Sequence, residues 1–205
     1  MHGSVTLHHS SLTKGGAVFP WVRLIRVGFG LIGASRVDIF ATTRVALRVW
    51  PNDLDLNLHV NNGRYLALAD IGRLQWFMLS GALAVARRHQ AFPVVGDAIA
   101  KFRRDLKLFQ RFEIHTRLIG WDSKWGFIEH RFVRGRRVLG MVVVRGLFKG
   151  ADGPMDPGVL FAGLAHSAPS PPLPEWTARF QQSAEQLSDA LRAEERSQGL
   201  RGQHE

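Results

Sequence analysis

Cysteine is absent from all 205 residues of the chain. This absence excludes disulfide bonds, thiolate metal sites and a cysteine nucleophile, and it is compatible with the cytoplasmic location that we expect. A lysine-rich tract of the nucleic-acid-binding type is also missing, because the basic residues are scattered along the chain. Trp121 and Trp125 interleave with charged residues, but at strand spacing, which is typical of core packing. We therefore expect no nucleic-acid partner.

A long uninterrupted apolar run is missing as well. The apolar segment 17–34 contains Arg23 and Arg26, so it is too charged for a membrane span, which needs about 20 apolar residues. The arginines lie inside the run and not before it, which argues against a signal peptide. We expect an amphipathic arm that packs on the domain, with peripheral contact to a membrane through residues 17–34 as the alternative.

The same arm contains Gly28, Gly30 and Gly33 in the spacing GxGxxG. In dinucleotide-binding proteins this pattern follows a strand and opens a helix. Here the residues that follow are β-branched and alternate in polarity, so they favour extended structure. We therefore reject a nucleotide site in this arm.

Basic residues outnumber acidic ones, with 27 Lys and Arg against 17 Asp and Glu, so the formal net charge is +10. A field of this sign attracts an anionic partner, such as an acidic membrane surface or a phosphorylated small molecule. The hydrophobic fraction of 45% is ordinary for a globular protein, and the length suffices for one domain with a complete core.

The hydrophobic pattern predicts a strand, a long helix and four further strands. Residues 43–49 alternate with period two, as a half-buried strand does. Residues 62–81 are apolar on much of a helix circumference, with Asn61 or Asn62 as N-cap and Gly81 near the end. The segment 82–90 extends or follows this helix. Later strands are predicted at 94–102, 111–120, 125–134 and 137–148, and the links between the last three are short enough for antiparallel hairpins.

A helix that is apolar nearly all round needs cover on most of its surface. The order of elements therefore predicts an α+β fold, in which a curved antiparallel sheet wraps around one long central helix. We divide the chain into a flexible N-terminus and amphipathic arm (1–42), the sheet-and-helix domain (43–150), and a proline-rich linker with a peripheral C-terminal helix (151–205).

The polar segment "DLDLNLHVNNGRYL", residues 53–66, lies between the first strand and the long helix. In an extended chain, Asp55, Asn57 and His59 project to one side, and the leucines between them anchor the segment to the core. A half-buried carboxylate can act as a nucleophile or a general base, and the N–H groups at a helix start can form an oxyanion hole.

A purely structural interpretation of this segment stays open from the residues alone. In that interpretation Asp53, Asp55 and Asn57 form Asx-turns, and Asn61 and Asn62 only cap the helix.

The run "WPNDLDLNLHVNNGRYL" resembles the motif of hotdog-fold thioesterases. It is similar to the "DLDxNxHVNNxxY" pattern of plant acyl-carrier-protein thioesterases, and more closely to bacterial and animal proteins related to the 4-hydroxybenzoyl-CoA thioesterase group. The similarity covers residues 43–150, because residues 101–133 also resemble the strand region of that group. The resemblance implies that Asp55 is the catalytic nucleophile or general base, and that Asn57 and His59 take part.

The resemblance further implies a thioesterase of lipid metabolism, which hydrolyses an acyl-CoA or acyl-carrier-protein thioester without a metal or a cofactor. It implies a homodimer or a dimer of dimers, whose shared groove takes the acyl chain. Coenzyme A carries phosphate groups, which basic residues can meet. The residues that we assign to substrate binding are Asn61, Asn62, Gly63, Tyr65, Arg103 and Arg104.

A second catalytic acid is expected from the plant enzymes, but the motif does not locate it. Asp70 and Asp97 are candidates. For Asp70, an ion pair with Arg73 or Arg64 on the helix face is the preferred interpretation.

Two alternatives to a thioesterase stay open. The first is a non-catalytic acyl-CoA-binding or membrane-associated protein of the same fold, which the basic apolar arm and the missing second acid favour. The second is an enoyl-CoA hydratase, which ranks lower. That family places its histidine one residue farther from the aspartate than His59 lies from Asp55, and it lacks the "HVNN" continuation.

Overall fold

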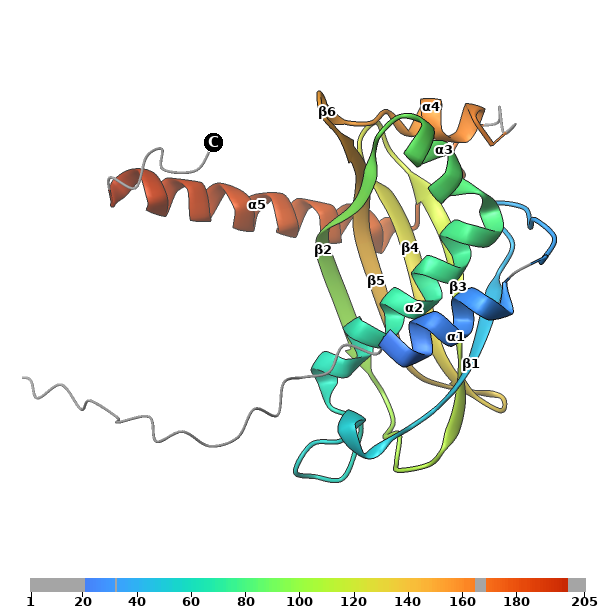
Figure 1. Ribbon diagram of the computed structural model, residues 1–205. Coiled ribbons are helices and arrows are strands. Elements are labelled where there is room, and N and C mark those ends of the chain that lie inside the picture. Colours follow the sequence, from blue (N-terminus) through green and yellow to red (C-terminus); the bar gives the residue numbers. More distant parts are fainter. Residues whose placement is uncertain (1–20, 32, 165–168, 199–205) are drawn as a thin grey trace, which may run out of the picture.

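The computed structural model describes residues 21–31, 33–164 and 169–198. Helix α2 (Asn62–Ser80) lies at its centre, and a curved antiparallel sheet packs against it (Figure 1). The sheet has the strand order β1-β3-β4-β5-β2, and β6 extends β5. The strands are β1 (Thr43–Arg48), β2 (Phe92–Phe102), β3 (Arg111–Trp121), β4 (Gly126–Arg134), β5 (Arg137–Gly150) and β6 (Gly153–Pro154). The predicted arrangement of a curved sheet around one long helix is confirmed.

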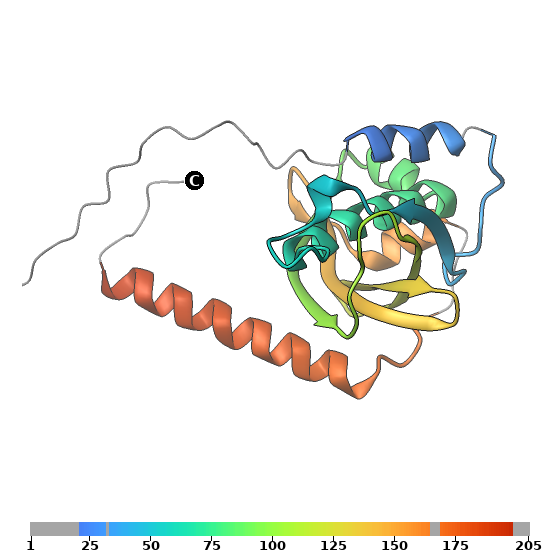
Figure 2. The ribbon, with the colours of Figure 1, turned by 90° about the horizontal axis from the view of Figure 1, so that it is seen from below.

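The other helices lie on both sides of the sheet (Figures 1 and 2). On the side of α2, α1 lies alongside it, α3 follows it directly, and α4 lies beside α3. On the opposite side, α5 crosses the sheet and projects beyond β2. These helices are α1 (Trp21–Gly30), α3 (Ala82–Arg88), α4 (Pro157–Ala162) and α5 (Glu175–Ser197), and a 3-10 turn η1 (Pro51–Asp53) leads into the motif and contains its first residue, Asp53. None of the helices in these ranges is both long and apolar enough to span a membrane.

The ends of α2 follow from its terminal residues. Asn61 is the N-cap, and its side chain accepts a hydrogen bond from the N–H of Gly63 at 2.8 Å. Gly81 ends the helix with φ 82°, a left-handed conformation that costs glycine little. Both caps were predicted, and α3 follows α2 as a separate helix because Gly81 breaks the continuity between them.

The core lies between α2 and the inner face of the sheet. From α2, Leu68, Ile71 and Trp76 are fully buried, and Ile114 and Phe132 meet them from the sheet. This packing agrees with a helix that is apolar on much of its circumference.

The arm predicted for residues 17–34 contains α1, whereas residues 17–20 and residue 32 lie outside the described residues. Leu24 and Val27 of α1 pack against the core, so the packing of the arm on the domain is confirmed for this helix. Its other face is exposed.

Asp53 joins α1, the end of β1 and α2 to one another. Its carboxylate is almost completely buried, at 1% exposed. Arg23 of α1 donates to both of its oxygens, at 3.0 and 2.6 Å. Arg64 of α2 donates at 3.0 Å, and the N–H of Trp50 donates at 2.8 Å. Burial alone would raise the pKa of Asp53, but the hydrogen bonds from Arg23 and the other two donors hold that pKa below its usual value of 3.8.

We predict that Asp53→Asn lowers the free energy of unfolding by about 2–3 kcal/mol at neutral pH, because Arg23 and Arg64 then face no buried charge. The pKa of Asp53 is lowered in the folded state. Its contribution is therefore fully present above the unfolded-state pKa and is lost as the pH falls through the lower folded-state pKa. The difference in unfolding free energy between the wild type and Asp53→Asn should therefore shrink only at acidic pH.

Urea denaturation of both proteins across this pH range measures the effect. The matched control is Asp152→Asn, which neutralises an exposed acid in the turn after β5. An Asp53→Asn protein as stable as the control at neutral pH would contradict the structural role of Asp53.

Candidate functional site

The motif residues 54–60 form a tight turn, which we call the motif turn. Leu54 and Val60 face each other in an antiparallel bridge. Inside this bridge, the N–H of Asp55 donates to the carbonyl of His59 at 2.9 Å. The turn lies directly before α2, so it presents Asp55 near the start of that helix.

The expectation that the leucines of the motif anchor it to the core is wrong for two of them. Leu56 is 101% exposed and Leu58 is 71% exposed. The chain reverses between Asp55 and Leu58, because the N–H of Leu58 donates to the Asp55 carbonyl at 3.0 Å and Leu58 adopts φ 60°. A reversed chain does not keep the alternation of an extended one, and only Leu54 packs against the core.

The polar residues of the motif turn have different partners. Asp55 is half-buried, and its Oδ1 accepts the backbone N–H of Asn57 at 2.9 Å, which is an Asx-turn. The Asn57 side chain is exposed. His59 Nε2 lies 3.4 Å from Oδ2 of Asp105. The structure thus places Asp55, Asn57 and His59 on one short turn, with the His59 side chain directed to a carboxylate from another part of the chain.

Asp105 belongs to the loop 103–110 between β2 and β3, which we call the basic loop. A bridge between His59 and Lys107, together with a hydrogen bond from the Val60 N–H to the Leu106 carbonyl at 2.9 Å, attaches this loop to the motif turn. Sequence reasoning missed Asp105. The only signal in the sequence was a lone acid in the basic stretch "FRRDLK".

Arg103 and Arg104 lie in the same basic loop. Their backbone N–H groups both donate to the carbonyl of Leu139 at 2.9 Å, and their side chains are exposed. The fold therefore brings these two arginines to the end of the molecule that carries the motif turn. They are separated from the motif by some forty residues of sequence.

The remaining predicted substrate residues lie at the start of α2. Asn61, Asn62 and Gly63 are exposed, and the N–H of Gly63 is already bound by the Asn61 side chain. Tyr65 is buried against Phe102, whose ring centroid lies 5.0 Å away. Burial and the negative charge of Asp105 raise the pKa of Tyr65 to about 12, so the phenol stays protonated near neutral pH.

The two candidates for a second acid lie elsewhere. Asp70 pairs with Arg73 on α2, as the preferred interpretation predicted. Asp97 pairs with Arg145 on the sheet face opposite α2. In the ranges that the structure describes, no group of His, Asp and Glu is arranged to hold a metal ion.

An apolar cavity of about 50 Å³ lies at the far end of α2. Trp76 and Phe77 of α2, Val94 of β2 and Phe161 of α4 contribute to its lining. With a rise of 1.5 Å per residue, Trp76 lies about 20 Å along the helix from Asn62. Within one chain, the motif turn and this cavity are therefore at opposite ends of α2.

The protein-family model of the thioesterase-like superfamily matches residues 49–181 of the sequence. Protein THEM6 of Xenopus laevis is 41% identical over 85 residues, which is 42% of this chain and 41% of that protein. A probable thioesterase of Saccharomyces cerevisiae is 28% identical over 105 residues, which is 51% of this chain and 42% of that protein. The chain thus spans less than half the length of these relatives.

Solved structures share the fold. The probable thioesterase YbaW of Escherichia coli superposes with a TM-score of 0.55 at 21% identity, over 59% of this chain and 95% of that one. The gentisyl-coenzyme A thioesterase BH1999 superposes with a TM-score of 0.52 at 18% identity, over 60% of this chain and 100% of that one. At these identities the likeness establishes the fold, and the predicted α+β hotdog fold is confirmed. Because the family model matches more than half of its residues, the chain belongs to the thioesterase-like superfamily.

Proposed function

We propose that the protein hydrolyses an acyl-CoA or acyl-carrier-protein thioester, with Asp55 as general base or nucleophile. The observation that carries this proposal is the position of Asp55, half-buried in the motif turn at the start of α2. Membership of the superfamily and relatives that are named thioesterases support thioester hydrolysis in general.

In the general-base route, Asp55 takes a proton from water while the water oxygen attacks the thioester carbonyl carbon. The positive end of the α2 dipole stabilises the negative charge on the carbonyl oxygen, and the N–H of Asn62 is the proposed donor because the N–H groups of Gly63 and Arg64 already bind Asn61. The carbon–sulfur bond then breaks, and the thiolate leaves with a proton returned by Asp55 or donated by His59. The carboxylate of Asp105 can orient the imidazole of His59, because Oδ2 of Asp105 lies 3.4 Å from Nε2 of His59.

The basic loop suits the phosphates of coenzyme A or of a phosphopantetheine arm. Arg103 and Arg104 are exposed, and the loop that holds them is bridged to the motif turn. Arginine binds phosphate through a planar, bidentate donor pair, so these side chains can fix the polar end of the substrate while its thioester reaches Asp55.

The acyl chain is expected to enter the apolar cavity of a second copy of the protein. Strand β2 is last in the sheet order, and no strand of the described residues pairs with its outer edge, so this edge can pair with another strand. Its Phe102 end contacts Tyr65 near the motif turn, whereas Val94 and Val95 at its other end line the cavity. Antiparallel pairing of two β2 strands sets the motif turn of one copy beside the cavity of the other. The proposed active unit is therefore a homodimer.

A second proposal concerns helix α1, which we propose to contact an anionic membrane surface. Val22, Ile25 and Phe29 are 80%, 56% and 69% exposed on the face of α1 that points away from the domain. Arg26 of the same helix lines a groove together with Arg48 and Arg111. An apolar helix face next to basic residues suits insertion among acidic lipid head groups.

We predict that Asp55→Asn lowers kcat of thiol release from acyl-CoA by about 100-fold or more, because asparagine cannot accept the proton. Asparagine keeps the side-chain oxygen that binds the Asn57 N–H, so the turn and the circular dichroism spectrum should be unchanged. Asp152→Asn, which alters an exposed acid in the turn after β5, serves as the control and should keep full activity. Wild-type turnover by Asp55→Asn would rule out the proposed role of Asp55.

We predict that the protein co-sediments with phosphatidylglycerol-rich vesicles and not with phosphatidylcholine vesicles. The triple variant V22S/I25S/F29S should weaken this partitioning about tenfold or more, because it removes the apolar surface that inserts. The control variant V159S removes an exposed valine from α4 and should bind as the wild type does. Equal sedimentation of the triple variant and the wild type would exclude α1 as the contact.

A further inference from the structure

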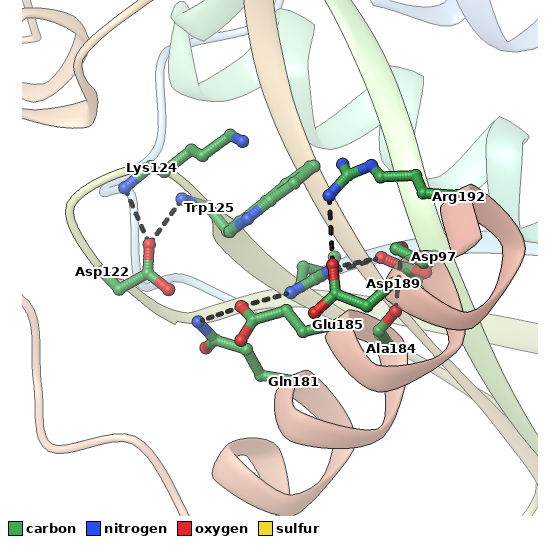
Figure 3. Close-up of polar contacts among 11 residues, drawn as sticks. Asp97, Asp122, Lys124, Trp125, Gln181, Ala184, Glu185, Asp189 and Arg192 are labelled. Carbon is green, nitrogen blue, oxygen red and sulfur yellow. Dashed lines mark hydrogen bonds and ion pairs between the residues drawn. The ribbon is translucent and has the colours of Figure 1, made fainter. Parts of the chain in front are cut away.

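Helix α5 is fixed to the outer face of the sheet, which is the face opposite α2, by a buried arginine. Arg145 of β5 is 3% exposed, and its guanidinium pairs with Asp97 of β2 at 2.6 Å and with Glu185 of α5 at 3.3 Å. The ring of Trp125 lies against the same guanidinium, with 4.5 Å between the ring centroid and Cζ. Figure 3 shows Asp97, Trp125 and Glu185 around this point. The helix is therefore attached at a defined place over β2 and β5.

A small apolar layer lies under the first half of α5. Phe127 and Val143 are fully buried, although they are not part of the main core around α2. Their places in the strand register put them on the outer face with Arg145, since Phe127 is directly opposite Arg145. Ala184 of α5 is 7% exposed. The first half of α5 thus covers apolar residues of its own sheet.

Among the described residues of its own chain, the second half of α5 has no such support. Ser188 is the last half-buried residue, and residues 189–198 are all exposed. With a rise of 1.5 Å per residue, the helix continues about 14 Å from Ser188 to its end at Ser197. Figures 1 and 2 both show this part projecting beyond β2.

The apolar face of α5 nevertheless continues into the projecting half. Leu187 and Leu191 follow Ala184 by three and seven residues, so they lie on the helix face that is buried over the sheet. They are 61% and 52% exposed. A helix end that stayed in water would need no leucines on this face. The position of Leu187 and Leu191 therefore predicts a further apolar surface that continues the outer face of the sheet.

Such a surface exists on the outer face of β2. Ile99 is 45% exposed, and its place opposite Val143 in the register puts it on the outer face. Strand β2 also has its free edge on the side toward which α5 projects. A second copy joined at that edge would present its own Ile99 under the projecting half of α5.

We propose that α5 is a clasp between two copies of the chain, in which Leu187 and Leu191 pack on the outer face of the second copy near Ile99. The clasp rests on the β2 pairing of the proposed function. Neighbouring strands are about 4.8 Å apart, so an overhang of about 14 Å reaches across β2 and β5 of the second copy. Under a two-fold axis each α5 crosses the joint in the same way, and the assembly closes as a dimer.

Sedimentation equilibrium of L187E/L191E tests the clasp. The dissociation constant of the dimer should rise about tenfold or more, because two charges replace the apolar contact on each helix. The control Q182E/Q186E adds the same charge on the opposite helix face, where both glutamines are exposed, and should leave the dissociation constant within about twofold. A dimer equally tight in L187E/L191E and in the control would overturn the clasp.

Cross-linking between differently tagged copies gives a second readout that does not depend on loss of stability. The chain has no cysteine, so Leu191→Cys in one copy and Ile99→Cys in the other are the only thiols. A bifunctional maleimide should join the two tags, and Gln186→Cys should not replace Leu191→Cys. If the protein forms dimers that do not cross-link in this way, the clasp is wrong, whereas the proposed β2 pairing is not contradicted. A monomer at all concentrations would remove both, whereas thiol release by the same preparation tests hydrolysis separately.

Discussion

The buried carboxylate of Asp53 is the interaction on which the arrangement around the motif turn depends. It is met by Arg23 from α1 and Arg64 from α2, while the chain that contains it leads from β1 into the turn. The charge is compensated on several sides, so its burial is tolerated and its pKa is lowered. The start of α2, and with it the position of Asp55, is therefore set by an acid two residues earlier that is itself inaccessible.

The two acids of the motif thus have separate environments. Asp53 is enclosed by arginines, and Asp55 is half-buried with one oxygen on a backbone N–H. In the proposed reaction this difference lets one carboxylate hold the fold while the other handles a proton. Basic residues follow the same division. Arg23 and Arg64 are paired with Asp53, whereas Arg103 and Arg104 of the basic loop are exposed. In the proposed reaction these two arginines bind the phosphates of the substrate.

Much of the fold could be predicted from periodicity, because the segments 43–49, 62–81 and 111–148 bury regular faces. The caps Asn61 and Gly81 were predictable for the same local reason. The conformation of the motif could not be predicted in this way. Its alternating leucines indicate an extended chain, whereas the reversal between Asp55 and Leu58 depends on a backbone hydrogen bond that the alternation does not reveal. The partner of His59 was also hidden. Asp105 is distant in sequence, and only the path of the basic loop brings it near. The short helix α4 was missed, although it begins with a local signal, because Asp156 caps it and Pro157 follows.

In the proposed dimer, α5 crosses from the outer face of one sheet to that of the other, and the motif turn of one copy lies beside the cavity of the second. Both parts of this proposal depend on strand β2, which lies at the end of the sheet order. Thioester hydrolysis is best tested by thiol release from the unaltered protein over a panel of acyl-CoA substrates that includes short, long and aromatic acyl groups. We predict saturable release for at least one class, and near-zero release for every substrate would contradict the proposed hydrolysis.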